Sequence, residues 1–246
     1  MKRRICLVDS RIPADAERRL SLLGFEVLTL PPHPALSSAV ASHTDMLLCP
    51  LGDEVISTAD YCDMAPYIFT DLFDVIRGSG KSIYFTDDRL CAEYPRDCAL
   101  NVLQMGDYLF ARTDSCSQHI IEKAKSMGLS IIPVRQGYPA CTVLRLDAWH
   151  AITADPGMAS ALRSVGITVY EIENGGIELP PHEYGFIGGS AGVFDGKVYF
   201  IGDPKTHPSA DVIYRACEEC GLSTVSLFSG RLCDLGGIVF IEGDLY

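Results

Sequence analysis

Positive charge is scarce in this chain. It has 20 Lys and Arg against 32 Asp and Glu among 246 residues, which gives a formal net charge of -12 at pH 7. Because proteins neutralise phosphate groups with Lys and Arg, this balance argues against nucleic acids and anionic membranes as partners. It is compatible with a small cationic ligand, and equally with an acidic surface that serves only solubility.

Long apolar runs are also missing, and no run approaches the roughly 20 residues that cross a membrane. Only four apolar residues, 5–8, stand between the basic start and Asp9, whereas the core of a signal peptide has about 7–15. We therefore expect a first strand here and not a targeting segment. Ten cysteines without an export signal are typical of reduced thiols, and we predict a cytoplasmic protein.

No linker, low-complexity tract or shift in composition divides the chain. Its 48% apolar and 21% charged residues are those of an ordinary globular protein. A chain of this length could bury about three-quarters of its unfolded surface without disulfide bonds. We predict a single domain over residues 1–246, with no expectation for its oligomeric state.

Motifs for metals and nucleotides are missing as well. Cys217 and Cys220 form a C-x-x-C motif, but no second Cys/His pair of similar spacing completes a zinc site. The glycine-rich segment 185–192 lacks the Gly-Lys-Ser/Thr of a phosphate-binding loop and leads into a turn between strands. We predict neither a metal nor a cofactor.

An internal repetition is present instead. A unit consists of an apolar strand ending in an acid, a helix stopped by glycine, a second strand and a closing segment. Asp155 precedes Gly188 by 33 residues, and Asp203 precedes Gly236 by the same 33. Such a shared spacing indicates a repeat architecture. Earlier acids in the same position are Asp9, Asp60 and Asp114, so that five units of about 41–54 residues fill the chain.

The first and last units look like the middle ones. A row of repeats normally has atypical ends, and a single unit cannot bury both of its faces. We therefore predict a closed ring, in which the closing segments meet at the axis and form a pocket. Helices at residues 36–42 and 68–76 belong to this expectation.

Five alternating units, with closing segments such as 185–189 and 234–237, resemble the pentein fold. This is the five-bladed β/α-propeller of guanidine-modifying enzymes, which include arginine and agmatine deiminases, dimethylarginine hydrolase and glycine amidinotransferase, besides non-enzymatic ribosome-binding relatives. The N-terminal half also resembles uncharacterised clostridial-type proteins of this superfamily. The resemblance implies an α/β, five-bladed β/α-propeller with pseudo-fivefold repeats.

In the family enzymes a cysteine near the C-terminus attacks the guanidinium carbon, a histidine transfers protons and paired carboxylates hold the nitrogens. These residue types suit that chemistry. The nucleophile directly follows a glycine pair in many members. The corresponding pair here is Gly236-Gly237, and Ile238 follows it. The resemblance therefore does not imply the standard mechanism for this chain.

The polar residues of the closing segments are the candidates for ligand binding, namely His43, Asp45, Asp97 and Asp234. Asp45 and Asp234 have similar sequence contexts, since each stands just before an apolar or glycine-rich strand. Two carboxylates that converge on the axis would suit a guanidinium or an amine. The alternative is that both cap turns through local backbone amides.

Three further residues are candidates for catalysis. Cys141 follows glycine and proline in a closing segment and is the best substitute nucleophile, with Cys233 second. Free cysteine is otherwise a small buried apolar residue. His207 could act as acid or base at the rim, or be an exposed loop histidine.

These observations predict a pentein-like protein whose acidic axial pocket binds a small guanidino or amine ligand, with non-standard or absent catalysis. One alternative is a cysteine-dependent amidinohydrolase or amidinotransferase that uses Cys141 or Cys233. It requires a thiol in the pocket within hydrogen-bond reach of a histidine or carboxylate. The other alternative is a non-catalytic protein-interaction ring, which requires a filled axis and an apolar external patch.

Overall fold

The fold is built from five three-stranded sheets and one two-stranded sheet, as a computed structural model of the chain shows. The structure describes residues 2–64, 66, 69–70, 76 and 80–244, and these counts refer to them. In each three-stranded sheet the central strand pairs antiparallel with one neighbour and parallel with the other. A helix links the central strand to its parallel neighbour, as parallel pairing requires a crossover.

The first sheet contains both ends of the described chain. Its strands are β1 (Lys2–Asp9), β2 (Glu26–Leu30) and β17 (Val239–Asp244), and its helix is α1 (Ala14–Leu22). The β1 strand pairs parallel with β2 and antiparallel with β17, with Ile5 opposite Ile241. The beginning and the end of the chain are therefore held together by backbone hydrogen bonds.

The next two sheets follow in chain order. The second consists of β3 (Cys49–Leu51), β4 (Glu54–Thr58) and β5 (Ser82–Thr86), with helix α3 (Ala59–Met64). The third consists of β6 (Leu103–Met105), β7 (Tyr108–Ala111) and β8 (Ser130–Pro133), with helix α5 (Gln118–Ser126).

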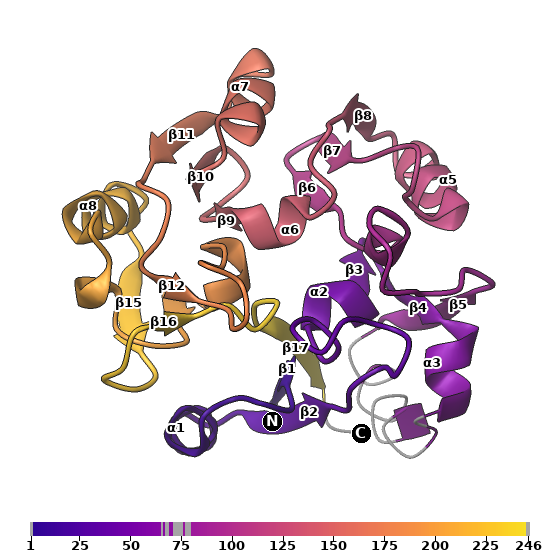
Figure 1. Ribbon diagram of the computed structural model, residues 1–246, viewed down its shortest axis with the longest axis horizontal. Coiled ribbons are helices and arrows are strands. Elements are labelled where there is room, and N and C mark those ends of the chain that lie inside the picture. The colour runs from indigo at the N-terminus through magenta and orange to yellow at the C-terminus, as the bar shows by residue number, and fades with distance from the viewer. Residues whose placement is uncertain (1, 65, 67–68, 71–75, 77–79, 245–246) are drawn as a thin grey trace.

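The last two sheets repeat the arrangement. The fourth consists of β9 (Val143–Arg145), β10 (His150–Thr153) and β11 (Thr168–Glu171), with helix α7 (Pro156–Ser164). The fifth consists of β13 (Ala191–Phe194), β14 (Lys197–Phe200) and β15 (Ser223–Ser226), with the 3-10 turn η3 (Pro204–Thr206) and helix α8 (Ala210–Glu219). In Figure 1 these elements succeed one another from α1 at the bottom, past α3, α5 and α7, to α8 on the left.

The acid after a central strand has a local structural role that helix α7 illustrates. Asp155 is the N-cap of this helix, and its side chain accepts a hydrogen bond of 2.7 Å from the backbone N–H of Met158. Pro156 occupies the first turn, where no intrahelical donor is lost. Asp203 caps η3 in the same way, through the N–H of Lys205. These acids therefore begin helices.

Short segments between the sheets lie toward the middle of the molecule in Figure 1. They are α2 (Thr44–Leu47), the 3-10 turn η1 (Arg96–Cys98), α6 (Pro139–Thr142), the 3-10 turn η2 (Gly188–Ser190) and the two-stranded sheet of β12 (Ile177–Glu178) and β16 (Leu232–Cys233). These are the expected closing segments, and they carry most of the candidate residues.

Among the described residues, the buried apolar side chains form five clusters, each of which joins two sheets. Leu7 packs with Val55, Ile56 with Leu109, and Phe110 with Ala151. Ile152 then packs in one cluster with Phe200. The remaining cluster contains Tyr199 of the fifth sheet and Cys6 of the first. Neighbouring sheets therefore share their cores in sequence order, and the fifth shares one with the first.

One predicted helix is wrong and another cannot be compared. Residues 38–42 form turns after an irregular stretch at 36–37, and the helix begins only at Thr44. The reason is that the backbone N–H of His33 bonds to the carbonyl of Ala41, which closes a loop that buries Leu36 and Ala39. The helix expected at 68–76 lies mostly outside the described residues.

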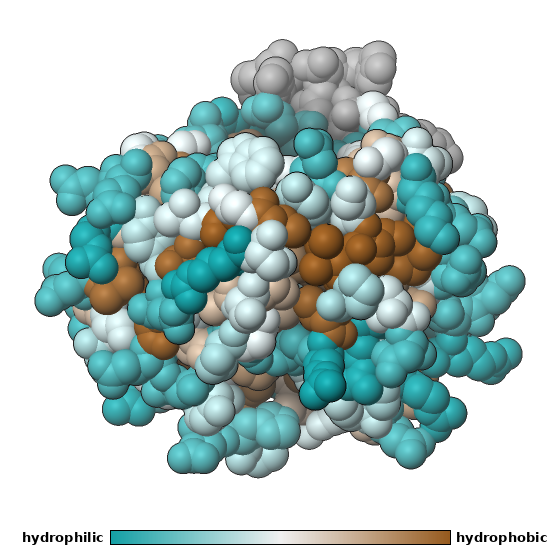
Figure 2. All heavy atoms as spheres, turned by 90° about the horizontal axis from the view of Figure 1, so that it is seen from above, coloured by the Kyte–Doolittle hydropathy of each residue, from teal (hydrophilic) through white to brown (hydrophobic). Residues whose placement is uncertain are grey.

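The surface is mixed in character. Figure 2 shows one face with hydrophilic side chains around its edges and apolar ones gathered nearer its middle. Within the described part of the chain, no helix has the length and apolar character needed to cross a membrane.

Candidate functional site

The site is a cavity of about 510 Å³ bounded by α2, η1, α6 and the segment 179–186. Its floor is made of buried residues, namely His43, Met46, Asp97, Cys141, Leu179 and Asp234. Its rim is made of exposed residues, namely Ser37, Ala92, Tyr94, His182, Glu183 and Tyr184. Val40, Tyr138 and Phe186 lie between the two. Four of the seven residues predicted from the sequence thus lie together on this floor.

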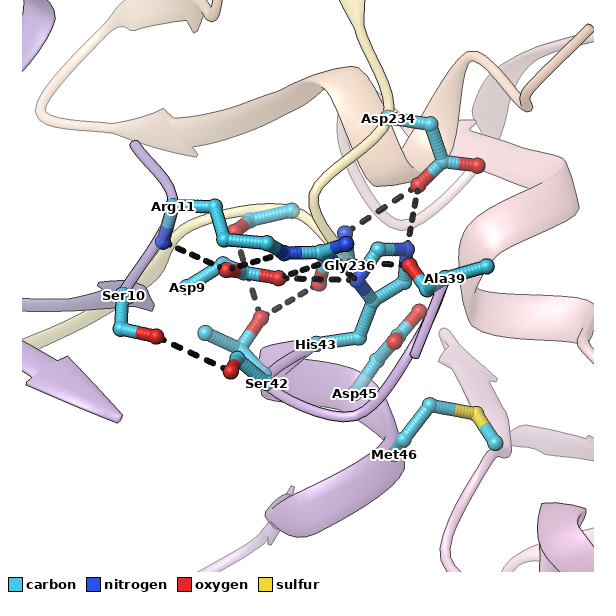
Figure 3. Close-up of polar contacts among 12 residues, drawn as sticks. Asp9, Ser10, Arg11, Ala39, Ser42, His43, Asp45, Met46, Asp234 and Gly236 are labelled. Carbon is cyan, nitrogen blue, oxygen red and sulfur yellow. Dashed lines mark hydrogen bonds and ion pairs between the residues drawn. The ribbon is translucent and has the colours of Figure 1, made fainter. Parts of the chain in front are cut away.

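His43 lies between two carboxylates, as Figure 3 shows. Its fully buried ring places Nδ1 3.0 Å from Asp9 Oδ2 and Nε2 3.3 Å from Asp234 Oδ1. The first contact is a hydrogen bond, whereas the second is an ion pair without hydrogen-bond alignment. Burial favours the neutral ring, but the two carboxylates outweigh it and raise the pKa of His43 to about 9. His43 is therefore a cation at neutral pH.

Asp9 is held from its other side by Arg11. The guanidinium Nη2 lies 2.6 Å from Asp9 Oδ2, and the backbone N–H of Arg11 donates to Oδ1 at 2.7 Å. Burial opposes ionisation, but these bonds and the one from His43 keep the pKa of Asp9 below its usual value. Asp9 ends β1, so the regular sheet positions the group that orients His43.

Cys141 is on α6 and only 3% exposed. Its thiol donates a hydrogen bond to Asp45 Oδ2, and the amide nitrogen of Asn101 lies 3.7 Å from the sulfur. Burial, together with the negative charges of Asp45 and Asp234, raises the pKa of Cys141 well above its usual value. Cys141 is therefore a protonated thiol at neutral pH, paired with a carboxylate.

Asp45 is buried on α2 and contacts Cys141 on α6. Burial raises its pKa to about 6, against the opposing effect of the His43 cation and the hydrogen bond from Cys141. Asp45 does not line the main cavity but a second one, of about 280 Å³, together with Gly236 and Ile238. Ile238 thus lines a different cavity from Cys141.

Asp97 is satisfied by two neutral donors. Its Oδ2 accepts a hydrogen bond of 2.5 Å from the hydroxyl of Tyr138, and its Oδ1 accepts one of 3.1 Å from the thiol of Cys98. Burial and the charge of Asp97 raise the pKa values of both donors. Both donors are neutral, and no ion pair joins Asp97 to a basic side chain among the described residues.

Asp234 follows β16 and is fixed by backbone amides. Its Oδ2 accepts from the N–H of Phe186 at 2.8 Å, and its Oδ1 from that of Gly236 at 3.1 Å. A Cβ at Gly189 would lie 1.9 Å from Asp234 Oδ1, and one at Gly185 would lie 2.4 Å from Asp234 Cβ. The glycine-rich segment is therefore required for close approach to this carboxylate. The turn-capping alternative describes Asp234 well, in addition to its contact with His43.

The structure places the other two catalytic candidates elsewhere. Cys233 donates to the carbonyl of Arg231 at 3.5 Å and lines a smaller hollow of about 270 Å³. Burial, with the nearby charge of Glu178, raises the pKa of Cys233 to about 11. Neither this thiol nor His207 lines the main cavity.

The expectation of an exposed loop histidine at position 207 is wrong. His207 is 3% exposed, and its Nδ1 accepts a hydrogen bond of 3.0 Å from the backbone N–H of Ser209. Its ring also packs so tightly that a Cβ at Gly176 would lie 2.9 Å from it. Burial lowers the pKa of His207. The residue is a structural part of the turn before α8.

Several residues of the site were missed in the sequence. Tyr138 precedes Cys141 by three residues in the same segment, so its neighbourhood was a usable signal. Asp9 ends a strand as expected, but nothing local indicates that it would orient a histidine 34 residues later. Asn101, Tyr94 and the rim segment 182–184 gave no signal, because only the tertiary fold brings them to the cavity.

One group of side chains in the described part of the chain could hold a metal ion. The ligand atoms of Asp147, His150 and Cys220 lie within 4.8 Å of one another. None of the three lines the main cavity. The Asp147 carboxylate already accepts from the backbone N–H groups of Trp149 and His150 and from the His150 ring. A structural turn explains this group without an ion.

Comparison with solved structures identifies the fold. A structure of dimethylarginine dimethylaminohydrolase (DDAH) from Pseudomonas aeruginosa, in complex with citrulline, has a TM-score of 0.57 at 12% identity, with 91% of each chain covered. An amidinotransferase of saxitoxin biosynthesis from Microseira wollei has a TM-score of 0.52 at 12% identity, with 94% of this chain and 81% of that one covered.

A third similar structure is the N-terminal domain of a cyanobacterial arginine dihydrolase bound to its product. Its TM-score is 0.55 at 11% identity, with 91% of this chain and 90% of that one covered. At such low identity the likeness establishes the fold and nothing further. No curated protein sequence matches the chain. The chain shares the pentein fold and belongs to the family of unknown function DUF6873, whose model matches residues 7–239.

Proposed function

We propose that residues 1–246 form one domain, a five-bladed β/α-propeller with pseudo-fivefold symmetry. Three observations support this arrangement. The five sheets have the same strand order, five clusters of buried residues join the sheets pairwise in sequence, and β17 pairs with β1. In such a ring the closing segments surround the axis, where the cavity would then lie.

We propose that this cavity binds a small guanidinium or amine compound. The observation that carries the proposal is that Asp97 and Asp234 line this cavity, with Asp45 behind them in contact with Cys141, against the single positive charge of His43. Buried carboxylates without a counter-charge are costly. A bound cation would offset that cost, and the planar N–H groups of a guanidinium match carboxylate oxygens well.

The similar structures agree with this choice of ligand. Their names describe proteins that act on dimethylarginine or arginine, or that transfer amidino groups. All of these compounds contain or donate a guanidinium-type carbon. We further propose a reducing, cytoplasmic setting, because all ten cysteines are free thiols.

A thermal-shift and calorimetry panel tests the binding proposal. Methylguanidine, agmatine and putrescine should raise Tm in a concentration-dependent way, because a ligand that binds only the folded state stabilises it. Methylurea, which has a similar shape and no charge, should have no effect at the same concentration. A panel in which no cation shifts Tm or gives measurable heat would contradict the proposal.

A second candidate is cysteine-dependent cleavage of a guanidine. It is favoured by Cys141, which lines the cavity together with His43 and donates a hydrogen bond to Asp45 beside it. As the thiol proton passes to Asp45, the sulfur bonds to the guanidinium carbon. The C–N bond to the leaving amine then breaks as that nitrogen takes a proton from His43. Water attacks the carbon, gives a proton to His43 and releases the sulfur, which recovers its proton from Asp45.

The raised pKa of Cys141 fits this scheme only with a cationic substrate. The charges of Asp45 and Asp234 disfavour the thiolate. A bound guanidinium would compensate for them and bring the pKa of Cys141 down, so that the nucleophile would form only with substrate in place.

Mass spectrometry of a guanidine panel incubated with the protein tests cleavage. Release of the free amine should be abolished in Cys141→Ser and retained in Cys233→Ser, because Cys233 lines another hollow. The opposite result would assign the chemistry to Cys233. If the wild-type protein bound these guanidines without cleaving them, the binding proposal would stand and the cleavage proposal would fail.

The interaction-ring alternative is less well supported. It requires a filled axis, whereas acidic side chains and a thiol line a cavity between the closing segments. Apolar side chains do gather on the face in Figure 2, but apolar atoms make up much of any protein surface.

A further inference from the structure

Apart from His43, the charged residues that line the main cavity are acidic, on the floor and on the rim. Asp97 and Asp234 lie on the floor and Glu183 on the rim. Among the described residues, no Lys or Arg lines the cavity, and the ring of His43 already lies between Asp9 and Asp234. The floor suits one cation, and the rim presents a further carboxylate to the other end of the same ligand.

The arginines nearest the cavity are engaged elsewhere. Arg11 binds Asp9 and the carbonyls of Ser38 and Ala39, and it lines the smaller hollow that also contains Cys233. Arg112 lies 5.1 Å from the ring centre of Tyr94 and forms an ion pair with Asp114.

The third nearby arginine, Arg96, forms an ion pair of 2.5 Å with Glu93. Its side chain is 69% exposed to solvent. None of the three lines the cavity, so none of them would pair there with an anionic group on a ligand.

The rim combines this carboxylate with aromatic side chains. Tyr184 is 36% exposed, and Tyr94 is 48% exposed with the guanidinium of Arg112 5.1 Å from its ring centre. Aromatic faces attract ammonium groups and accept alkyl chains. A ligand carboxylate at this level would instead face Glu183, and juxtaposed like charges lower affinity.

We infer that the ligand is a guanidine or amine without a carboxylate, whose far end is an amine or is uncharged. The inference rests on the proposed binding function and narrows it. It separates this chain from the P. aeruginosa relative, which was solved with citrulline, an amino acid. The chemical class is that of decarboxylated guanidino compounds and diamines.

Three ligands with the same guanidinium test the inference by calorimetry. Agmatine lacks the carboxylate of L-arginine, and L-arginine methyl ester has it masked. We expect agmatine and the ester to bind at least about tenfold more tightly than L-arginine, which corresponds to about 1.4 kcal/mol. Equal or tighter binding of L-arginine would overturn the inference and leave the proposed function standing. If methylguanidine and agmatine also fail to bind, the proposed function itself fails.

A charge-reversal variant locates the effect at the rim. Glu183→Arg should weaken agmatine binding and strengthen L-arginine binding, so that the Kd of L-arginine divided by the Kd of agmatine falls by about tenfold or more. Glu122→Arg, an equivalent change at an exposed position of α5, should leave the ratio unchanged. A ratio that is insensitive to Glu183→Arg in a folded variant would show that the rim carboxylate does not select the ligand.

Discussion

The thiol of Cys141 is hydrogen-bonded to Asp45, which lies 96 residues earlier in the chain. Asp45 comes from α2 and Cys141 from α6, two short helices that follow different sheets. The pair thus depends on the packing of the closing segments and not on local sequence. Its consequence is a thiol whose ionisation is controlled by a neighbouring carboxylate.

Asp45→Asn should make Cys141 more reactive. Removal of the carboxylate charge takes away one cause of the raised pKa of Cys141, so the thiolate fraction at a fixed pH near 7.5 increases. A small neutral reagent, methyl methanethiosulfonate, with peptide-resolved mass spectrometry should show several-fold faster modification of Cys141. Asp211→Asn, an exposed change on α8, serves as the control. An unchanged or slower rate would show that Asp45 does not control the thiol.

Stability should fall between about pH 6.5 and 9 because of His43. Its pKa in the folded protein is about 9, above its usual value of 6.5. A group whose pKa is raised on folding stabilises fully below the unfolded value and loses this contribution as the pH rises through the folded one. The loss should be roughly 2–3 kcal/mol. Urea unfolding at pH 6, 7, 8 and 9 should show this slope in the wild-type protein.

The matched variants for this measurement are His43→Gln and His182→Gln. The first removes the buried cation and should flatten the slope, besides lowering stability at pH 6. The second changes an exposed rim histidine and should retain the slope. A slope between pH 7 and 9 that persists in His43→Gln would assign it to another group, since Asp45, with a pKa of about 6, is mostly ionised by pH 7.

The architecture could be predicted from the sequence because its signals are local. Apolar strands that end in an acid, and glycines that stop helices, depend on hydrogen bonds and backbone freedom within a few residues. Asp155 and Asp203 do cap the helical turns that follow them. The meeting of the closing segments followed from the same repetition, which is why His43 and Cys141 were candidates before the fold was known.

Other features depend on contacts between distant segments and gave no local signal. His207 stands in a polar, proline-containing loop, yet the fold buries it beside Gly176. The choice of Cys141 over Cys233 follows from which hollow each thiol faces. The failed helix at 36–42 has the same cause, because a backbone bond between His33 and Ala41 prevails over local helix preference.

Gly189→Ala should damage the site and the fold together. The added Cβ would lie 1.9 Å from Asp234 Oδ1, so the carboxylate must move and its bonds to the segment weaken. We expect a loss of about 1–3 kcal/mol in the free energy of unfolding and weaker agmatine binding. Gly157→Ala in α7 is the control, because its Cβ would meet only the tip of Asp155 at 3.1 Å. Its stability should stay within about 1 kcal/mol of the wild type.

The Asp97–Tyr138 pair allows charge and hydrogen bonding to be separated. Asp97→Asn removes the negative charge and should weaken agmatine binding about tenfold, by about 1.4 kcal/mol. Tyr138→Phe keeps the charge and removes one donor to Asp97. It should lower the free energy of unfolding by about 1 kcal/mol while agmatine binds as well as before or better, since an Asp97 oxygen becomes free to accept from the ligand. Calorimetry and urea unfolding on both variants measure the two effects. If Tyr138→Phe weakened binding as much as Asp97→Asn, the tyrosine hydroxyl itself would be the ligand contact, and the charge of Asp97 would not be what holds the cation.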